Sequence, residues 1–219
     1  MTPEELLALA RAELGVTESP AGSNRVKYNR AYYGREVSGS GYPWCCVFIW
    51  WLFRQAGCSH LFYGGKQTAY CPALLTYHKK VGQAVSDYRP GDIIFFDFNG
   101  NGTADHVGLC ESWDGTCITT IDGNTGEQSE SNGGAVMRRT RSKKYIAGAY
   151  RPAYREEETM THLQFDNLMA DWLARQSERP GSPWSTMPEA MRAGITDGTR
   201  PQSFATREEV ATMIVSAKL

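Results

Sequence analysis

Apolar residues near the N-terminus recur with the spacing of an α-helix. They are Leu6, Leu7, Leu9, Ala10 and Leu14. Thr2 is a suitable N-cap, Pro3 suits the first turn, and Glu5 stands three residues after the cap, as in a capping box. Gly15 ends the periodic stretch. The pattern therefore predicts an N-terminal helix that buries one face.

A second apolar run, CCVFIWWLFRQAG, extends from Cys45 to Gly57 after the turn-rich segment VSGSGYPW. Its apolar side chains surround the helix axis on almost every side, which is typical of a central helix packed against a sheet. Pro43 lies where the first turn would begin. The run predicts a buried helix with two thiols, those of Cys45 and Cys46, at its N-terminus.

After Gly57 the pattern changes to short β-rich segments bounded by Gly, Asn, Asp or Pro. These segments are 91–96, 106–113, 116–122, 135–140 and 145–152. Helices followed by consecutive strands with tight turns indicate an α+β fold with an antiparallel sheet. The dipeptide Asp114-Gly115 predicts a two-residue hairpin turn in which Trp113 pairs with Thr116.

The composition shifts again at Arg155, which suggests three parts of the chain. We expect one full-sized domain over residues 1–154 and a charged linker over 155–161. Residues 162–219 repeat apolar positions at helical spacing, interrupted by ERPGSPW, and predict a small all-α module. This module is near the lower size limit for independent folding.

The formal net charge is −1, so no global field favours binding to nucleic acid. No apolar run approaches the length of a membrane span. The N-terminus reads as a capped helix rather than a signal peptide. We therefore expect a protein made in the cytoplasm, with no nucleic-acid or membrane partner.

The six cysteines include no CxxC pair, and the four histidines are scattered. A structural zinc site needs a tighter grouping of ligands. The chain is also large and apolar enough to fold without a disulfide framework. We expect most of the cysteines to be small buried hydrophobic residues.

Cys45 and Cys46 differ from the other cysteines because they are expected at a helix start. Unpaired backbone N–H groups and the helix dipole favour a thiolate there, and predict a lowered thiol pKa. The same N–H groups could stabilise the oxyanion formed when a thiolate attacks a carbonyl. The alternative is that both side chains only fill space, and position alone does not choose between them.

A nucleophilic cysteine needs a base, and His106 is the strongest candidate. It begins the predicted strand HVGLCESW, where a side chain can meet a cleft. The predicted hairpin register puts His106 opposite Gly123, between the polar residues Asp122 and Asn124, either of which could orient the imidazole. Strict alternation would point these two to the other face, so we expect a bulge or a strand end near Gly123. The remaining histidines, expected to be at the surface or partly buried, are His60, His78 and His162.

The loop DFNGNGTAD before His106 alternates oxygen-bearing side chains in the manner of a calcium loop. These are Asp97, Asn99, Asn101 and Asp105. The loop lacks a downstream bidentate Glu at the EF-hand distance, and Asn replaces most of the carboxylates. We therefore expect a polar β-turn.

Four segments in order, PWCCVFIWW, RPGDIIFFDF, DHVGLCES and IDGNTG, resemble the CHAP domain, a papain-like cysteine amidase/peptidase that acts on peptidoglycan. The segment VKYNRAYYG is similar to the one that precedes the catalytic helix of that family. The resemblance covers about residues 1–154. It implies a papain-like CHAP fold, with N-terminal helices packed on an antiparallel β-sheet, and no metal or organic cofactor.

The family element W-C-x-x-F-V-x-W falls on residues 44–51, with Ile49 in place of Val. The resemblance therefore implies that Cys45 is the nucleophile. Cys46 occupies a position that the family usually fills with a small residue such as Ala, so we expect it to pack.

The resemblance places the catalytic histidine of the family on His106. The family element E-x-N falls on Asp122-Gly123-Asn124, with Asp in place of the usual Glu. The implied catalytic residues are thus Cys45, His106, Asp122 and Asn124, with either of the last two orienting the imidazole. The implied reaction is hydrolysis of an amide bond, by an amidase or an endopeptidase.

The segment 190–217 resembles one repeat of the S-layer homology type, and Thr206 with Glu209 forms a capping box within it. The resemblance implies binding to cell-wall polysaccharide. The alternatives are that this module mediates self-association, or that it is a helical appendage that stabilises the fold.

The leading hypothesis is a peptidoglycan hydrolase of the endolysin type, from a phage or prophage, which acts on the cell wall after release from the cytoplasm. One alternative is a non-catalytic wall-binding protein on a papain-like scaffold. Another is a cysteine-dependent acyltransferase or toxin-type amidase with a different acceptor.

Overall fold

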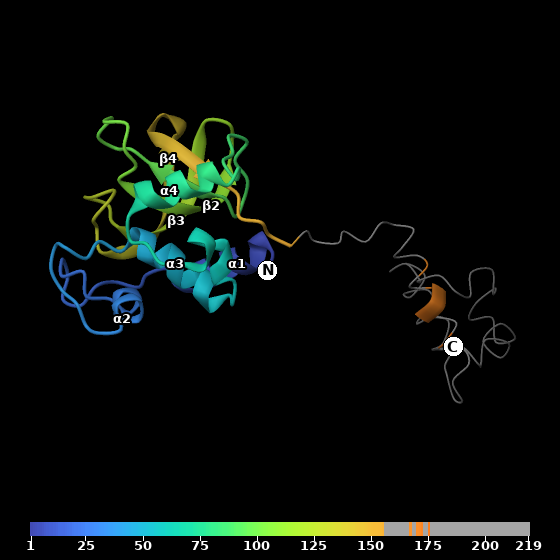
Figure 1. The fold of residues 1–219 in the computed structure, drawn as a ribbon, viewed down its shortest axis with the longest axis horizontal. Coiled ribbons are helices and arrows are strands. Elements are labelled where there is room, and N and C mark those ends of the chain that lie inside the picture. The colour runs from blue at the N-terminus through green and yellow to red at the C-terminus, as the bar shows by residue number, and fades with distance from the viewer. Residues whose placement is uncertain (156–166, 168–169, 173–174, 176–219) are drawn as a thin grey trace, which may run out of the picture. The chain divides into compact units, whose positions relative to one another are not determined.

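The computed structural model describes residues 1–155, 167, 170–172 and 175 (Figure 1). Internal contacts divide the chain into two units, Met1–Glu157 and Glu158–Leu219. The fold described below is that of the first unit. The predicted module at 162–219, with its S-layer-like segment 190–217, lies almost wholly outside the described residues and stays a prediction.

Four α-helices precede or flank a five-stranded sheet. The helices are α1 (Pro3–Ala12), α2 (Lys27–Tyr33), α3 (Cys45–Gln55) and α4 (Cys71–Lys80). The strands are β1 (Ile93–Phe96), β2 (His106–Trp113), β3 (Cys117–Thr125), β4 (Ala135–Ser142) and β5 (Ile146–Tyr150). Short 3-10 turns occupy Ser59–Leu61, Tyr63–Gly65 and Lys143–Tyr145. The strand order is β4-β3-β2-β1-β5, with antiparallel neighbours throughout. The predicted α+β class is confirmed.

The N-terminal helix has the predicted cap. The Thr2 side chain accepts a hydrogen bond from the Glu5 N–H, and the Glu5 carboxylate accepts one from the Thr2 N–H at 2.8 Å. Leu6, Leu7 and Ala10 form the buried face of α1. The capping box therefore fixes where the helix begins, and the apolar stripe fixes how it packs.

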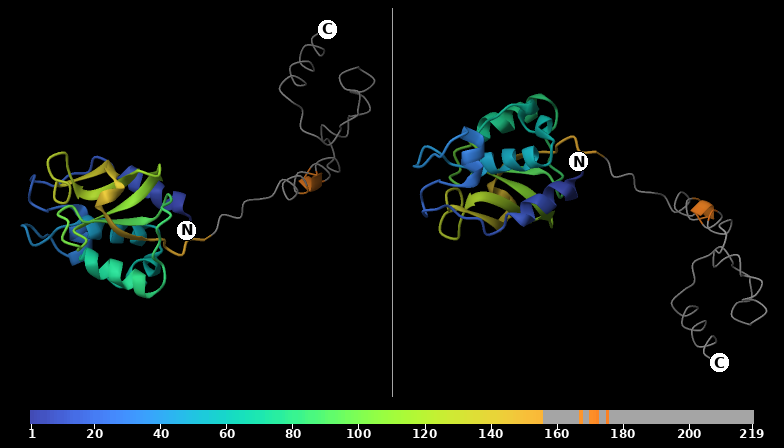
Figure 2. Two further views of the ribbon diagram at one scale, coloured as in Figure 1. Left: turned by 90° about the horizontal axis from the view of Figure 1, so that it is seen from above. Right: turned by 90° about the horizontal axis from the view of Figure 1, so that it is seen from below.

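Helix α3 packs on β2 and β3, α1 packs on β2 and α3, and α4 packs beside β5 (Figures 1 and 2). The main core lies between these helices and the sheet. Its large buried side chains include Leu6, Leu7, Phe48, Ile49, Leu52, Phe53, Phe95, Val107, Leu109 and Ile121. A smaller cluster contains Ile94, Phe96, Cys110, Ile118 and Ala149. Both faces of the central strands are therefore buried.

Helix α3 approaches the sheet closely because β3 carries a glycine at the contact. A Cβ on Gly123 would lie 2.5 Å from Cβ of Phe48 and 2.8 Å from Cζ3 of Trp44. Any larger residue would push the start of α3 away from β3. Gly123 therefore sets the distance between the thiol-bearing helix and the strand that carries Asp122.

The hairpin between β2 and β3 differs from the prediction. Trp113 pairs with Ile118 rather than Thr116, because Asp114 Oδ1 accepts the N–H groups of Thr116 and Cys117 and closes a longer turn. A bulge at Glu111 then shifts the register again, so that Leu109 pairs with Ile121. The predicted pairing of His106 with Gly123 is therefore wrong.

Helix α4 was not predicted from the sequence, although its residues alternate between buried and exposed at helical spacing. Cys71, Leu74, Leu75 and His78 form its buried face. Pro72 in the first turn and His78, Lys79 and Lys80 in the last are consistent helix signals. The segment is short and only weakly apolar, and no side chain caps its N-terminus.

Within the part of the chain that the structure describes, no helix combines the length and the apolar character needed to cross a bilayer.

Candidate active site

Cys45 is the first residue of α3, as predicted. The preceding Trp44 is held in place by a buried hydrogen bond from its Nε1 to Glu18 Oε1, at 2.8 Å. The first intrahelical bond of α3 runs from the Phe48 N–H to the Trp44 carbonyl, which leaves earlier N–H groups of the first turn without an intrahelical acceptor. The thiol of Cys45 therefore lies where free backbone donors are concentrated.

His106 contacts Asp122 directly. Its Nε2 lies 3.0 Å from Asp122 Oδ2, and both side chains are fully buried. Because a carboxylate only accepts hydrogen bonds, Nε2 carries the proton of this bond. Nδ1, the other ring nitrogen, has no hydrogen-bond partner of ordinary geometry among the described residues. Whenever the imidazole is neutral, Nδ1 is therefore its proton acceptor.

The shifted register explains how Asp122 reaches His106. Pairing of Leu109 with Ile121 places Gly108 opposite Asp122, on the same face as His106. A Cβ on Gly108 would lie 1.9 Å from Asp122 Oδ1. The carboxylate thus occupies the space that a side chain at position 108 would fill, and the conflict with strand alternation disappears.

Arg141 on β4 is the second partner of Asp122. Its Nη1 donates to Asp122 Oδ2 at 2.6 Å, and its Nε donates to Glu130 Oε2 at 2.7 Å. Its guanidinium also lies 4.8 Å from the ring centre of Phe96. Only 5% of Arg141 is exposed. The site therefore contains an alternating row of charges from His106 through Asp122 and Arg141 to Glu130.

Asn124 takes no part in the contact with His106. It is buried, with φ at 58°, and its Nδ2 donates to Asn132 Oδ1 at 3.2 Å. The register of β3 against β4 shifts between Asp122 and Thr125, close to where the sequence predicts an irregularity. Of the two candidates for orienting His106, the structure brings only Asp122 to the imidazole.

The charges around His106 change its ionisation. Burial lowers the pKa of His106, but the hydrogen bond to Asp122 and the interaction with Cys45 outweigh burial and raise that pKa to about 9. Burial likewise raises the pKa of Asp122, but His106 and the charge of Arg141 outweigh it and lower that pKa. The carboxylate therefore stays ionised beside a strongly basic imidazole.

Cys45 and His106 are close enough for each to shift the pKa of the other. The pKa of Cys45 is nevertheless raised, first by the contact with Cys71 and then by burial, while His106 acts in the opposite direction. The predicted lowering of the Cys45 pKa by the helix start is therefore wrong. The Sγ of Cys71, a residue that no sequence pattern marks, lies 3.7 Å from Cys45 Sγ.

Cys46 points elsewhere. It is fully buried, and its Sγ donates to the Thr68 carbonyl at 3.4 Å. Consecutive residues of a helix project about 100° apart, so two adjacent thiols cannot face one imidazole. The geometry therefore agrees with Cys45, rather than Cys46, as the partner of His106.

The other described histidines lie outside this constellation. His60 is exposed, as expected. His78 is buried, contrary to the prediction of a surface or partly buried residue, because it faces the core side of α4 and stacks on Tyr150. His162 lies outside the described residues.

The loop from Asp97 to Asp105 is closed by its own hydrogen bonds. Asp97 Oδ1 accepts from the Gly100 N–H and Oδ2 from the Gly102 N–H, while Asp105 Oδ2 accepts from the Phe98 N–H. These are the contacts of a polar turn. Among the residues that the structure describes, no group of three or more His, Cys, Asp or Glu could hold a metal ion.

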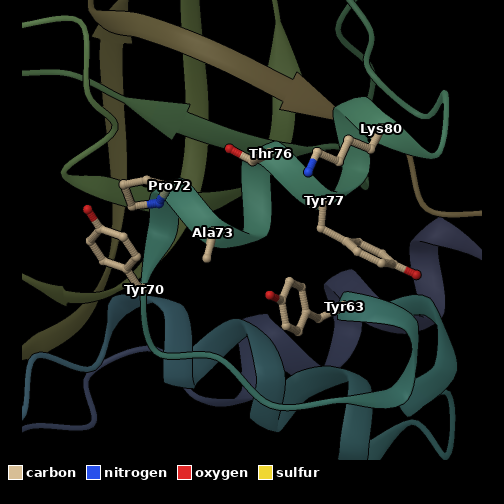
Figure 3. Close-up of a pocket in the computed structure, with 7 residues that line it drawn as sticks. All are labelled: Tyr63, Tyr70, Pro72, Ala73, Thr76, Tyr77 and Lys80. Atoms are coloured by element: carbon tan, nitrogen blue, oxygen red, sulfur yellow. The ribbon is translucent and has the colours of Figure 1, made fainter.

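A cavity of about 380 Å³ lies on the outer side of α4 (Figure 3). Tyr63, Tyr70 and Tyr77 contribute aromatic rings, and Lys80 contributes a cation. Neither Cys45 nor His106 lines it.

Four residues that the sequence analysis missed therefore shape the site, namely Glu18, Cys71, Gly108 and Arg141. Gly108 stands between apolar strand residues, which is a signal for close approach of another group. The other three are ordinary residue types whose importance comes from contacts distant in sequence.

Part of the chain is similar to a known protein family, and the chain also aligns with solved structures. The family model described as "CHAP domain" matches residues 37–124. No curated protein matches the chain. The solved structures that align with it include "The crystal structure of Ly7917", at 18% identity and a TM-score of 0.42. They also include "The crystal structure of Ly7917 with the hydrolyzing product of MDP", at 17% identity and a TM-score of 0.45. Each alignment covers 71% of this chain and 66% of the other, so the chain spans slightly less than two thirds of their length.

The matched segment includes the whole of α3, α4, β1 and β2 and most of β3. The helices and the five-stranded antiparallel sheet are consistent with the papain-like CHAP fold. Residues 37–124, which contain Cys45, His106, Asp122 and Asn124, are therefore the part of the chain that is similar to the CHAP domain.

Proposed function

We propose that the protein hydrolyses an amide bond of bacterial peptidoglycan, with Cys45 as nucleophile, His106 as general acid and base, and Asp122 as the group that orients His106. The observation that carries this proposal is a buried His106–Asp122 pair close to a thiol at a helix start. The match of residues 37–124 to the CHAP domain supports peptidoglycan as the substrate class.

In the proposed reaction, Nδ1 of the neutral form of His106 takes the proton of the Cys45 thiol, and the thiolate attacks the carbonyl carbon of the amide. The charge that develops on the carbonyl oxygen is stabilised by free N–H groups in the first turn of α3. His106 then gives its proton to the departing amine, and a thioester remains on Cys45.

Water completes the reaction. His106, now neutral, removes a proton from a water molecule that attacks the thioester carbonyl. Asp122 keeps the imidazole in the tautomer that presents Nδ1 to the thiol throughout, and its negative charge stabilises the imidazolium between steps. This division of roles needs no metal or organic cofactor.

We propose cleavage at either the muramoyl–L-alanine bond or a link in the stem or cross-bridge peptide, and an endolysin-type role in lysis from within. The C-terminal module at 162–219 is proposed to bind cell-wall polysaccharide or to self-associate. Binding there would raise the local concentration of the active site on the wall.

The test compares three proteins on a suspension of Gram-positive cell walls and on defined muropeptides. Wild type and Cys46→Ala should both clear the suspension, while Cys45→Ala should not. Mass spectrometry of the muropeptide products then identifies the bond and separates an amidase from an endopeptidase.

The alternative functions predict different results. Equal clearing by wild type and Cys45→Ala would refute the thiol mechanism. Binding to walls without products in any variant would indicate a non-catalytic wall-binding protein. Products that carry an added acceptor would indicate an acyltransferase.

A further inference from the structure

Two helix starts bring two thiols into contact. Cys45 begins α3 and Cys71 begins α4, and their Sγ atoms lie 3.7 Å apart. Both side chains are almost fully buried, with 4% and 5% of each residue exposed. All six cysteines are free thiols. A disulfide requires an S–S distance of about 2.05 Å, so closure needs the sulfur atoms to approach by less than about 2 Å.

We propose that Cys45 and Cys71 form a reversible disulfide when the protein meets a peroxide, with Cys71 acting as the resolving thiol of an oxidised Cys45. The pair is thus a modification site whose reactant is hydrogen peroxide or a small organic peroxide. For its effect on activity the inference rests on the proposed function, but formation of the disulfide does not depend on hydrolysis of any substrate.

The reaction takes place in two balanced steps. The Cys45 thiolate, whose proton has passed to His106, attacks one peroxide oxygen, so that an S–O bond forms and the O–O bond breaks. The departing hydroxide takes the proton from His106 and leaves as water. The Cys71 sulfur then attacks the Cys45 sulfur, an S–S bond replaces the S–O bond, and the Cys71 proton leaves with the hydroxide as a second water. Two thiols are oxidised and one peroxide is reduced.

His106 is what makes Cys45 the sulfur that reacts first. Its basic imidazole can accept the thiol proton and return it to the leaving hydroxide. The groups that shift the pKa of Cys71 are instead Cys45, Cys46 and Asp105, none of which is a histidine. Cys46 instead donates to the carbonyl of Thr68. Cys58 and Cys110 likewise donate to nearby backbone carbonyls, those of Ala56 and Ser112.

The disulfide would have two consequences for the site. It removes the nucleophile, so the oxidised protein cannot form a thioester. It also prevents a second peroxide from converting the sulfenic acid of Cys45 into a sulfinic acid, which a thiol reductant does not reverse. Reduction by a dithiol returns both thiols and forms a disulfide in the reductant.

The test treats the full-length protein with a small excess of hydrogen peroxide, alkylates the remaining thiols after denaturation, and measures the intact mass. Wild type and Cys46→Ala should each lose two hydrogen atoms and two alkylation sites, and dithiothreitol should restore both. Cys71→Ser should form no disulfide and should instead gain two oxygen atoms, as a sulfinic acid at Cys45. Cys45→Ala should show neither change.

Peptide mapping of wild type gives a second readout that needs no variant to fold. A tryptic digest without reduction should contain the peptide 36–54 joined to the peptide 67–79. In Cys46→Ala the same link should persist, which assigns it to Cys45.

Direct formation of a sulfinic acid in wild type would overturn the proposal, and so would a disulfide in Cys45→Ala that matches the wild-type yield. Failure of this inference can be distinguished from failure of the proposed function. A disulfide that forms in a protein without hydrolase activity refutes the function alone, and an active enzyme that forms no disulfide refutes the inference alone.

Discussion

His106 and His78 are both buried, yet each contacts a partner of different charge. His106 Nε2 bonds to the carboxylate of Asp122, whereas His78 Nδ1 lies 2.6 Å from the amide oxygen of Gln83. The ring of His78 also stacks on Tyr150, with 3.4 Å between ring centres. The pKa of His106 is raised to about 9, while burial lowers the pKa of His78, which the bond to Gln83 only partly opposes.

The comparison shows that burial alone does not make a histidine basic. A buried ring with a neutral partner resists protonation, because the charged form loses its hydration. A buried ring beside a carboxylate gains a counter-charge that outweighs this loss. Only the second arrangement stabilises the imidazolium that forms when the ring takes a proton from a neighbouring thiol.

The two histidines also affect folding stability in opposite pH ranges. The pKa of His106 in the folded protein lies above its ordinary value of 6.5. Its contribution to the free energy of unfolding is therefore fully present below pH 6.5 and is lost as the pH rises through about 9. The folded pKa of His78 lies below 6.5, so its contribution is present above pH 6.5 and is lost as the pH falls below that value.

Asp122→Asn should have the largest effect, because it gives His106 an amide partner like that of His78. We expect the rate of muropeptide hydrolysis to fall by about 10²- to 10⁴-fold, since the imidazole loses both its counter-charge and its fixed tautomer. The rate is measured with saturating muropeptide near neutral pH. Asn124→Ala is the control, because Asn124 does not contact His106, and it should retain most of the activity.

Gly108→Ala tests whether Asp122 needs the space that a glycine leaves. The new methyl group would displace the carboxylate and misplace His106, which should cost about 10²-fold in activity and about 1–3 kcal/mol in stability. Urea unfolding together with the hydrolysis rate separates the two effects. Full activity in a stable Gly108→Ala protein would contradict the proposed role of this close approach.

Arg141→Met tests the second partner of Asp122. Loss of a buried cation that pairs with a buried carboxylate should lower the unfolding free energy by about 3 kcal/mol. Arg139→Met is a matched control, because Arg139 pairs with the half-exposed Glu130 and not with Asp122. It should cost no more than about 1 kcal/mol. Equal losses of unfolding free energy in Arg141→Met and Arg139→Met, measured by urea unfolding, would show that burial beside Asp122 is unimportant.

Gln83→Glu is the converse of the change at Asp122, because it gives His78 a carboxylate partner. The pKa of His78 should rise, and the loss of stability that we expect of wild type below pH 6.5 should become smaller or reverse. Thermal unfolding between pH 5 and pH 7 measures this difference. If thermal stability depends on pH in Gln83→Glu as it does in wild type, the charge of the partner does not control the pKa of these histidines.

Cys46→Ala should have the smallest effect. The side chain packs beside Cys45 without facing His106, so we expect activity close to that of wild type and a loss of stability of about 1 kcal/mol. An inactive Cys46→Ala with an active Cys45→Ala would reverse the assignment of the nucleophile.

Much of this architecture could be predicted from local patterns. The capping box of α1, the apolar helix after Trp44 and the five strands are encoded by neighbouring residues, and the structure confirms them. Helix α4 was missed because its residues are only weakly apolar. The S-layer-like segment remains a prediction.

The site was only partly predictable, because its geometry depends on small register changes. The Asp114 side chain lengthens the hairpin turn, and one bulge at Glu111 shifts the pairing again. The one-residue bulge brings Asp122 to the face of His106, a result that strict alternation excludes. The contacts of Cys71 and Arg141 span elements far apart in the sequence, and no local signal marks them.

The contrast between His106 and His78 is tested most directly by NMR of the histidine ring nitrogens from pH 5 to pH 10. In wild type, His106 should titrate near pH 9 and His78 below pH 6.5, and Asp122→Asn should lower the His106 midpoint while His78 is unchanged. A His106 that titrates at or below pH 6.5 in wild type, or one that is indifferent to Asp122→Asn, would contradict the role of Asp122 in making His106 the base.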